Sequence, residues 1–155
     1  MATCHKEKVL SLVERDGKVR SFHVANISAK ELLPIIKKNV KKGTTVYTDQ
    51  GNQYVRKKPL LRDEFPTHEY VKHSAGEYVR GDVHTNTVES FFSVFKRGVG
   101  GIYQHISHAH LNRYLSEFDF RHNHREKLGF DDEMRTRAML KGIEGKKLMY
   151  KWPSA

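Results

Sequence analysis

The stretch that decides the fold runs from His84 to Arg97 and reads HTNTVESFFSVFKR. Its apolar side chains recur in steps of three, one and three residues, a spacing that places them on one helix face: Val88, Phe91, Phe92 and Phe95. Glu89 and Lys96 have six residues between them, so they share a second face at about 3.6 residues per turn. We therefore predict an amphipathic helix that packs its phenylalanines on a core and presents a carboxylate beside a cation.

Upstream of this helix, the sequence predicts a hairpin, a helix and a strand. Residues 8–14 and 19–24 are strand-like and flank an Asp-Gly pair, which is a strong hairpin signal. A helix should follow from Asn26 or Ser28 to about Val40, with Glu31 placed for a capping box from Ser28. The strand Thr44–Thr48 then ends at Asp49.

The remaining segments are predicted from turn residues and from helical periodicity. Residues 50–65 should form a loop or short helix, 67–73 a short strand and 74–83 a loop. A second amphipathic helix is predicted over 107–120, and a short helical stretch over 136–140. We assign residues 1–128 to one core domain and 129–155 to a charged carboxyl-terminal tail with a frayed end. This order of elements indicates an α/β or α+β domain with mixed sheet order, and we predict the α/β class, with a mixed sheet flanked by helices.

Composition favours a nucleic-acid partner. Lys and Arg total 28 against 18 Asp and Glu, a net charge of +10 in 155 residues, and phosphate neutralisation by such cations dominates non-specific binding to nucleic acids. The single Cys4 excludes an internal disulfide and a cysteine-based zinc site, and it suits a reducing cytoplasm. No apolar run is long enough for a membrane span, so we expect a cytoplasmic protein without a membrane partner.

Two carboxylates stand out as candidate metal ligands. Phosphoryl transfer on nucleic acids uses divalent ions held by carboxylates from separate elements, and Asp49 at a strand end and Glu89 on a helix suit that demand. Each also has an ordinary explanation. Asp49 can form a turn after its strand, and Glu89 can be a solvated residue that pairs with Ser93 or Lys96.

Residues 46–125 resemble the catalytic domain of bacterial insertion-sequence transposases of the DDE class, in the ISXO-type group. The stretches that carry the resemblance are Val46–Asp49 (VYTD), His73–Tyr78 (HSAGEY), Asp82–Glu89 (DVHTNTVE), Lys96–Tyr103 and His110–Arg125. With the hairpin and the first helix, it extends over about residues 8–125.

This resemblance implies an RNase H-like fold and metal-dependent cleavage and transfer of DNA strands, with Mg²⁺ or Mn²⁺ as cofactor. Asp49 would be the second acidic ligand and Glu89 the third. Lys96 would contact DNA near the site, and Asn86 would line it. The partners would be DNA of the element ends and of the target.

The chain departs from this family's pattern at its amino terminus. The family's first catalytic aspartate lies on a strand before the hairpin, and nothing like it precedes Lys8. We therefore expect an amino-terminally truncated, defective copy that lacks the first strand of the sheet and is marginally stable or self-associated as a homo-oligomer. Asp16 falls in the hairpin turn and is a poor substitute for the first aspartate. Glu14 lies on a strand, although not on the first strand of the fold. If Glu14 replaced the first aspartate, the protein would be an RNase H-like nuclease, which is the least favoured hypothesis.

Basic residues and histidines support two further hypotheses. Five cationic residues are candidate DNA contacts: Lys96, Arg97, Arg113, Arg121 and Arg125. The same arginines, interleaved with aromatic residues, could instead form an RNA-binding module, although no RNP-like strand motif is present. A non-catalytic DNA-binding or regulatory derivative of the transposase is the main alternative to an enzyme. The clustered histidines 105, 108, 110, 122 and 124 match no zinc template by spacing, so we predict surface or capping roles for most of them.

Overall fold

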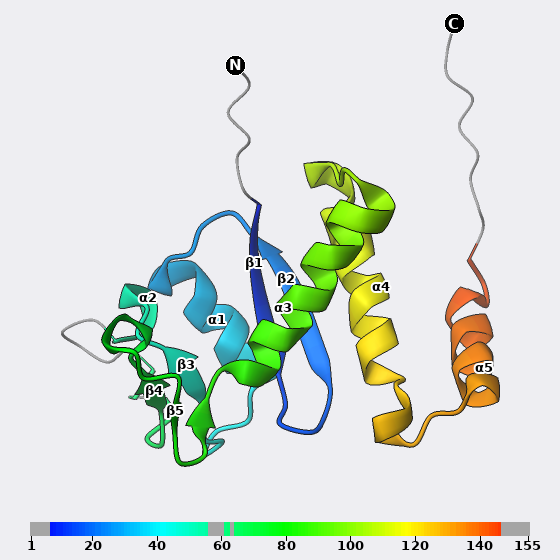
Figure 1. Cartoon of the computed structure of the whole chain (residues 1–155). Coiled ribbons are helices and arrows are strands. Elements are labelled where there is room, and N and C mark those ends of the chain that lie inside the picture. The colour runs from blue at the N-terminus through cyan, green and yellow to red at the C-terminus, as the bar shows by residue number, and fades with distance from the viewer. Residues whose placement is uncertain (1–6, 56–60, 63, 147–155) are drawn as a thin grey trace, which may run out of the picture.

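A hairpin forms the middle of the molecule. The computed structural model describes residues 7–55, 61–62 and 64–146. Strands β1 (Lys8–Val13) and β2 (Val19–Val24) pair antiparallel, with Lys8 opposite Val24. Asp16 turns the chain with a φ of 55°, a left-handed conformation that aspartate tolerates better than most residues. The predicted hairpin is confirmed (Figure 1).

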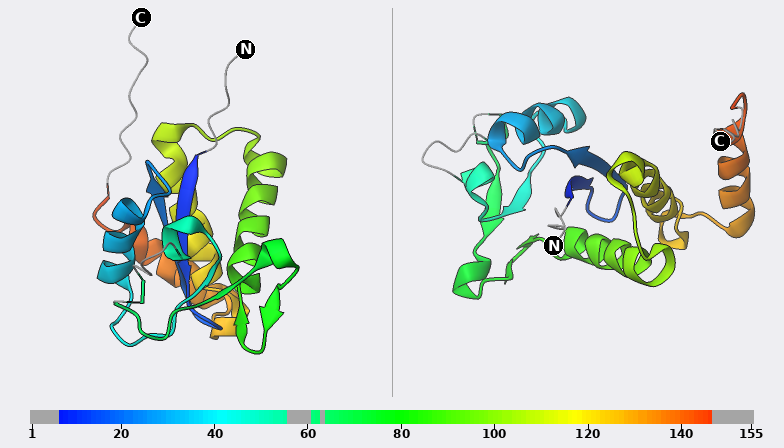
Figure 2. Two further views of the ribbon diagram at one scale, coloured as in Figure 1. Left: turned by 90° about the vertical axis from the view of Figure 1, so that its left-hand side faces the viewer. Right: turned by 90° about the horizontal axis from the view of Figure 1, so that it is seen from above.

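Helices cover both faces of this hairpin (Figure 2). Helix α1 (Ala29–Asn39) covers one face through a buried cluster: Leu10, Val24, Leu32, Ile36, Leu61 and Phe65. Helices α3 (Asn86–Gly98) and α4 (Leu111–Asn123) cover the other face through a second cluster: Val19, Phe91, Phe95, Leu111, Leu115 and Phe118. Alternating side chains of one strand pair thus serve two cores. An α/β domain is confirmed.

The strands form three separate pairs among the described residues, not the single mixed sheet that the sequence predicts. β3 (Tyr47–Asp49) and β4 (Glu69–Val71) are parallel, whereas β5 (Val79–Arg80) and β6 (Val83–His84) form a small antiparallel hairpin. The β5–β6 hairpin falls mostly within the segment predicted as a loop. In the described part of the chain, β1 is hydrogen-bonded only to β2, and β3 only to β4.

The helix that decides the fold is confirmed, and the next one begins later than predicted. α3 starts at Asn86 and continues into a π-helical turn, Val99–Tyr103. A 3-10 turn, His108–His110, precedes α4, so the α-helix begins at Leu111 instead of residue 107. The shorter helical elements are α2 (Asn52–Val55), the 3-10 turns His73–Ala75 and Glu126–Leu128, and α5 (Asp132–Ile143). Residues 56–60 and 63 of the predicted loop and the end of the tail, 147–155, lie outside the described residues.

The predicted capping box at the start of α1 does not form. The Ser28 side chain accepts no capping hydrogen bond. Instead, the Glu31 carboxylate accepts hydrogen bonds from the backbone N–H groups of Ala25 (2.8 Å) and Asn26 (2.7 Å). Glu31 therefore fixes the loop that leads from β2 into α1, because it binds backbone groups that precede Ser28.

Side chains of α4 occupy the outer edge of β2. Asn123 accepts a hydrogen bond from the Val19 N–H (2.6 Å) and donates to the Val19 carbonyl (2.8 Å). One turn earlier, Asp119 accepts from the N–H and the hydroxyl of Ser21, both at 2.7 Å. These contacts dock α4 on the sheet edge.

No helix in the described part of the chain has the length and apolarity needed to cross a membrane.

Candidate active site at the start of helix α3

Glu89 is held at the amino-terminal end of α3 by the residue that precedes the helix. The hydroxyl of Thr85 donates a hydrogen bond of 2.6 Å to Glu89 Oε1. Thr85 is buried, with 8% of its surface exposed, whereas the Glu89 side chain is 52% exposed. The buried threonine thus fixes one carboxylate oxygen, and the amino-terminal end of a helix favours the negative charge.

His73 extends this contact into a short chain of polar groups. Its Nε2 atom lies 3.2 Å from Thr85 Oγ1 and 3.7 Å from Glu89 Oε1. Because the single hydroxyl proton of Thr85 is directed at Glu89, the imidazole must donate to the threonine oxygen. The Tyr78 ring packs on His73 with ring centroids 5.1 Å apart. The positions of His73 and Thr85 beside Glu89 were not predicted from the sequence.

Asp49 ends β3 and is exposed. Its Oδ1 atom accepts a hydrogen bond from the Gly51 N–H (3.0 Å), so the turn-forming explanation of this residue holds in the structure. The next residue, Gln50, accepts a hydrogen bond of 3.0 Å from the Ser74 hydroxyl. Ser74 lies in the same 3-10 turn as His73. The turn His73–Ala75 is therefore contacted both by Gln50, the residue after Asp49, and by Glu89.

The other predicted residues of α3 lie along its exposed surface. Asn86 is the first residue of the helix and Glu89 follows one turn later. Lys96 and Arg97 lie in the last turn, and both are exposed. At about 1.5 Å of rise per residue, Lys96 is about 10 Å from Glu89 along the axis. Lys96 therefore lies about two turns from Glu89 on the same helix.

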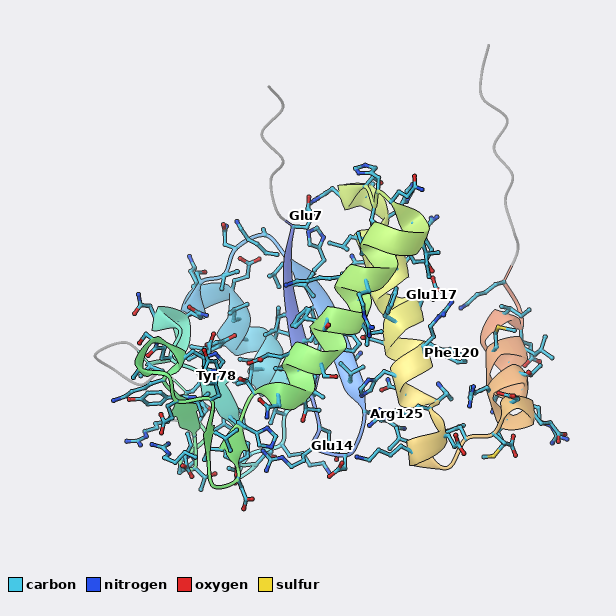
Figure 3. The ribbon with its side chains drawn as sticks, viewed as in Figure 1. Glu7, Glu14, Tyr78, Glu117, Phe120 and Arg125 are labelled. Atoms are coloured by element: carbon cyan, nitrogen blue, oxygen red, sulfur yellow. The ribbon has the colours of Figure 1, made fainter. Side chains whose placement is uncertain are left out.

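The predicted DNA-contacting arginines of α4 and of the following segment differ in whether their side chains already have partners within the chain. Arg113 is exposed. Arg121 forms an ion pair of 2.7 Å with Glu117, a carboxylate that also accepts a hydrogen bond from the Tyr103 hydroxyl. Arg125 donates to the His122 carbonyl (2.7 Å) and is half-buried. Figure 3 shows Glu117 and Arg125 on this part of the molecule. Arg121 and Arg125 thus already have partners within the chain.

The two acids considered as substitutes lie together at the hairpin turn. Asp16 forms an ion pair with Lys127, and the hydrogen bond from that lysine lowers the pKa of Asp16. Glu14 was predicted to lie on the strand, but β1 ends at Val13, so Glu14 is the first residue after the strand (Figure 3). Its backbone N–H donates to the Lys18 carbonyl (2.8 Å). Both positions are explained by the turn itself.

Comparison with known proteins identifies the family of this chain. The profile of the ISXO2-like transposase domain matches residues 2–123. An uncharacterized protein in transposable element ISH50 of Halobacterium salinarum is 44% identical over 77 residues. That alignment covers 50% of this chain and 25% of the relative, so the chain spans about a quarter of that protein's length. No solved structure matches. Because the profile covers most of its length, this chain belongs to the ISXO2-like transposase domain family.

Proposed function

We propose that this chain is a DDE-class catalytic domain with an RNase H-like fold, which takes part in metal-dependent cleavage and transfer of DNA strands at the ends of an insertion element. The observation that carries the proposal is the environment of Glu89. A half-exposed carboxylate is fixed by a buried threonine at a helix start, beside a turn that is hydrogen-bonded to Gln50, the residue after Asp49. Family membership supplies the reaction class.

Asp49 and Glu89 fit a divalent ion such as Mg²⁺ or Mn²⁺. Both are carboxylates, the hard oxygen ligands that these ions prefer. Within the described ranges, no group forms a hydrogen bond with Asp49 Oδ2 or Glu89 Oε2, so each acid has an oxygen to offer. When bound, such ions activate the attacking oxygen and stabilise the leaving oxygen of a phosphodiester.

The chain's own residues would position the DNA and the acids. Thr85 and His73 restrict the orientation of the Glu89 side chain, and Gln50 connects the Asp49 turn to the same 3-10 segment. Lys96, farther along the helix, would neutralise a backbone phosphate, and the net charge of +10 adds a sequence-independent attraction to DNA.

The shared ion site can be tested without any DNA. When hydrogen peroxide and ascorbate are added, Fe²⁺ that occupies a Mg²⁺ site reduces the peroxide to hydroxide and a hydroxyl radical, which cuts the polypeptide near the ligands, and ascorbate regenerates Fe²⁺. We expect paired cuts near residues 49 and 89, and we expect Asp49→Asn or Glu89→Gln to abolish both. Asp82→Asn is the matched control, because Asp82 is an exposed acid on the β5–β6 turn close to α3. Cuts near one acid that persist after loss of the other would disprove the shared site.

A second assay separates a catalytic domain from a non-catalytic DNA-binding derivative. The full chain is incubated with a labelled duplex that contains the DNA flanking its gene, with Mg²⁺ or Mn²⁺, and nicking and binding are measured together. Nicking that Asp49→Asn and Glu89→Gln each reduce by about a hundredfold or more supports the catalytic role. Salt-dependent binding without nicking, unchanged in both variants, would support the regulatory alternative instead.

A further inference from the structure

Three potential metal ligands converge at the open end of the hairpin. Oε2 of Glu7 lies 2.9 Å from His23 Nε2 and 2.9 Å from His108 Nδ1. The three ligand atoms all lie within 4.8 Å of one another. The two imidazole rings are 4.6 Å apart at an interplanar angle of 76°, so their nitrogen atoms approach the carboxylate from different directions. One point in space is thus surrounded by two imidazoles and a carboxylate.

These ligands come from three segments that are distant in sequence. Glu7 directly precedes β1, His23 lies on β2, and His108 begins the 3-10 turn before α4. The His23 side chain is 12% exposed and is therefore fixed by packing, whereas His108 is 73% exposed and Glu7 34%. One ligand is rigid and two can adjust.

The size of the cluster suits a first-row transition metal. Zinc ligands lie about 2.0–2.2 Å from the ion, which puts tetrahedral ligand atoms about 3.3–3.5 Å apart. The observed 2.9 Å contacts need to lengthen by only about half an ångström. The adjustable side chains of Glu7 and His108 can supply that shift. Two imidazoles favour Zn²⁺ over Mg²⁺, which prefers oxygen ligands in octahedral geometry.

The charge at the cluster also suits a cation. Glu7 contributes a carboxylate oxygen that lies 2.9 Å from a nitrogen atom of each imidazole, so the cluster combines one acidic ligand with two nitrogen ligands. The neighbouring Lys8 is directed elsewhere: its Nζ donates to the Ala25 carbonyl (2.9 Å) and to Asn26 Oδ1 (3.1 Å). No lysine amine therefore competes for Glu7 among the described residues.

We propose that Glu7, His23 and His108 form a zinc-binding site that joins the start of β1 to β2 and to the segment between α3 and α4. Three protein ligands leave a fourth position for water or for a further donor. The site is separate from the Asp49–Glu89 region: Figure 3 shows Glu7 at one end of the hairpin and Tyr78, which packs on His73, far from it. A bound ion would act as a cross-link that stabilises the folded chain.

Metal titration of the full chain, produced without a histidine tag and stripped with a chelator, tests this site. We expect one tight Zn²⁺ site by calorimetry, and a visible spectrum of tetrahedral type when Co²⁺ is bound. His108→Ala and Glu7→Gln should each weaken Zn²⁺ binding by about tenfold or more, since even partners outside the ligand set contribute that much. His110→Ala is the matched control, because His110 is exposed in the same turn.

The melting temperature gives a second readout. Zn²⁺ should raise the melting temperature of the wild-type chain and of His110→Ala, but not that of His108→Ala. Because His108 is largely exposed, the metal-free variant should melt like the metal-free wild type, which shows that it is folded. Absence of a tight site in the wild type, or equal losses in His108→Ala and His110→Ala, would overturn the proposal. The outcome is independent of Asp49 and Glu89.

Discussion

Replacement of Gly98 by alanine tests how tightly α3 is packed against α4. Gly98 is buried near the end of α3 and has ordinary helical dihedrals, φ −63° and ψ −45°, so an alanine backbone is not strained there. A Cβ atom at this position, however, would clash with Cζ of the Phe118 ring. The Phe118 ring cannot easily withdraw, because Phe95 packs edge-on against it at 5.0 Å and Tyr103 at 6.4 Å.

Two opposing effects set the magnitude. Alanine is favoured over glycine inside a helix by about 1 kcal/mol. Overpacking of a closed core costs about 1–3 kcal/mol, and a contact more than 1 Å inside van der Waals distance places Gly98→Ala at the upper end of that range. The net effect is a loss of about 2 kcal/mol in the free energy of unfolding, or about 4–8 °C in melting temperature for a chain of this size.

Urea unfolding followed by circular dichroism measures this loss, and an unchanged m-value would show that the unfolded state is unaffected. Gly100→Ala is the matched control, because nothing lies within 4 Å of a Cβ atom at Gly100. A second variant, Phe118→Leu, should make Gly98→Ala less costly, since the smaller side chain leaves room. If Gly98→Ala is as stable as the wild type, or Gly100→Ala is equally harmful, the packing argument is wrong.

Two further predictions concern pH and salt. Burial, followed by the nearby Arg62 charge, lowers the pKa of His68, whose Nε2 lies 2.9 Å from Thr48 Oγ1. Its contribution to stability is therefore present above about pH 6.5 and is lost as the pH falls through the folded-state pKa; urea midpoints should show a weaker acid loss in His68→Gln. Lys96→Ala should lower the salt slope of DNA binding by about 1, measured by fluorescence anisotropy. Arg121→Ala should lower it less, because Glu117 already neutralises Arg121; equal slopes would contradict the assignment.

Local patterns were sufficient to predict the hairpin and helix α3. The Asp-Gly turn and the spacing of Phe91 and Phe95 are decided by neighbouring residues, so the sequence carries them directly. The β5–β6 hairpin was missed because its strands are two residues each, which is too short for an alternation to be detected. The joining of strands into one sheet depends on distant segments and was predicted wrongly for the described residues.

The candidate site was also predicted only in part from the sequence. Glu89 could be found because its helix is evident from periodicity, whereas its contacts with Thr85 and His73 depend on a turn brought close only by folding. Whether Asp49 shares an ion with Glu89 stays a prediction. The Glu7, His23 and His108 cluster had no sequence signal, because its members are separated by 16 and 101 positions from Glu7.

The contacts of Asp119 and Asn123 with β2 have a consequence for solubility during assembly. An edge strand ordinarily has unpaired backbone N–H and C=O groups that can form hydrogen bonds with a strand of another chain, and proteins block such edges with lysines, prolines or bulges. Here a docked helix blocks the edge, because its carboxylate and amide occupy the N–H and carbonyl groups that an incoming strand would need. Protection against polymerisation along β2 is therefore conditional: it lasts only while α4 remains seated.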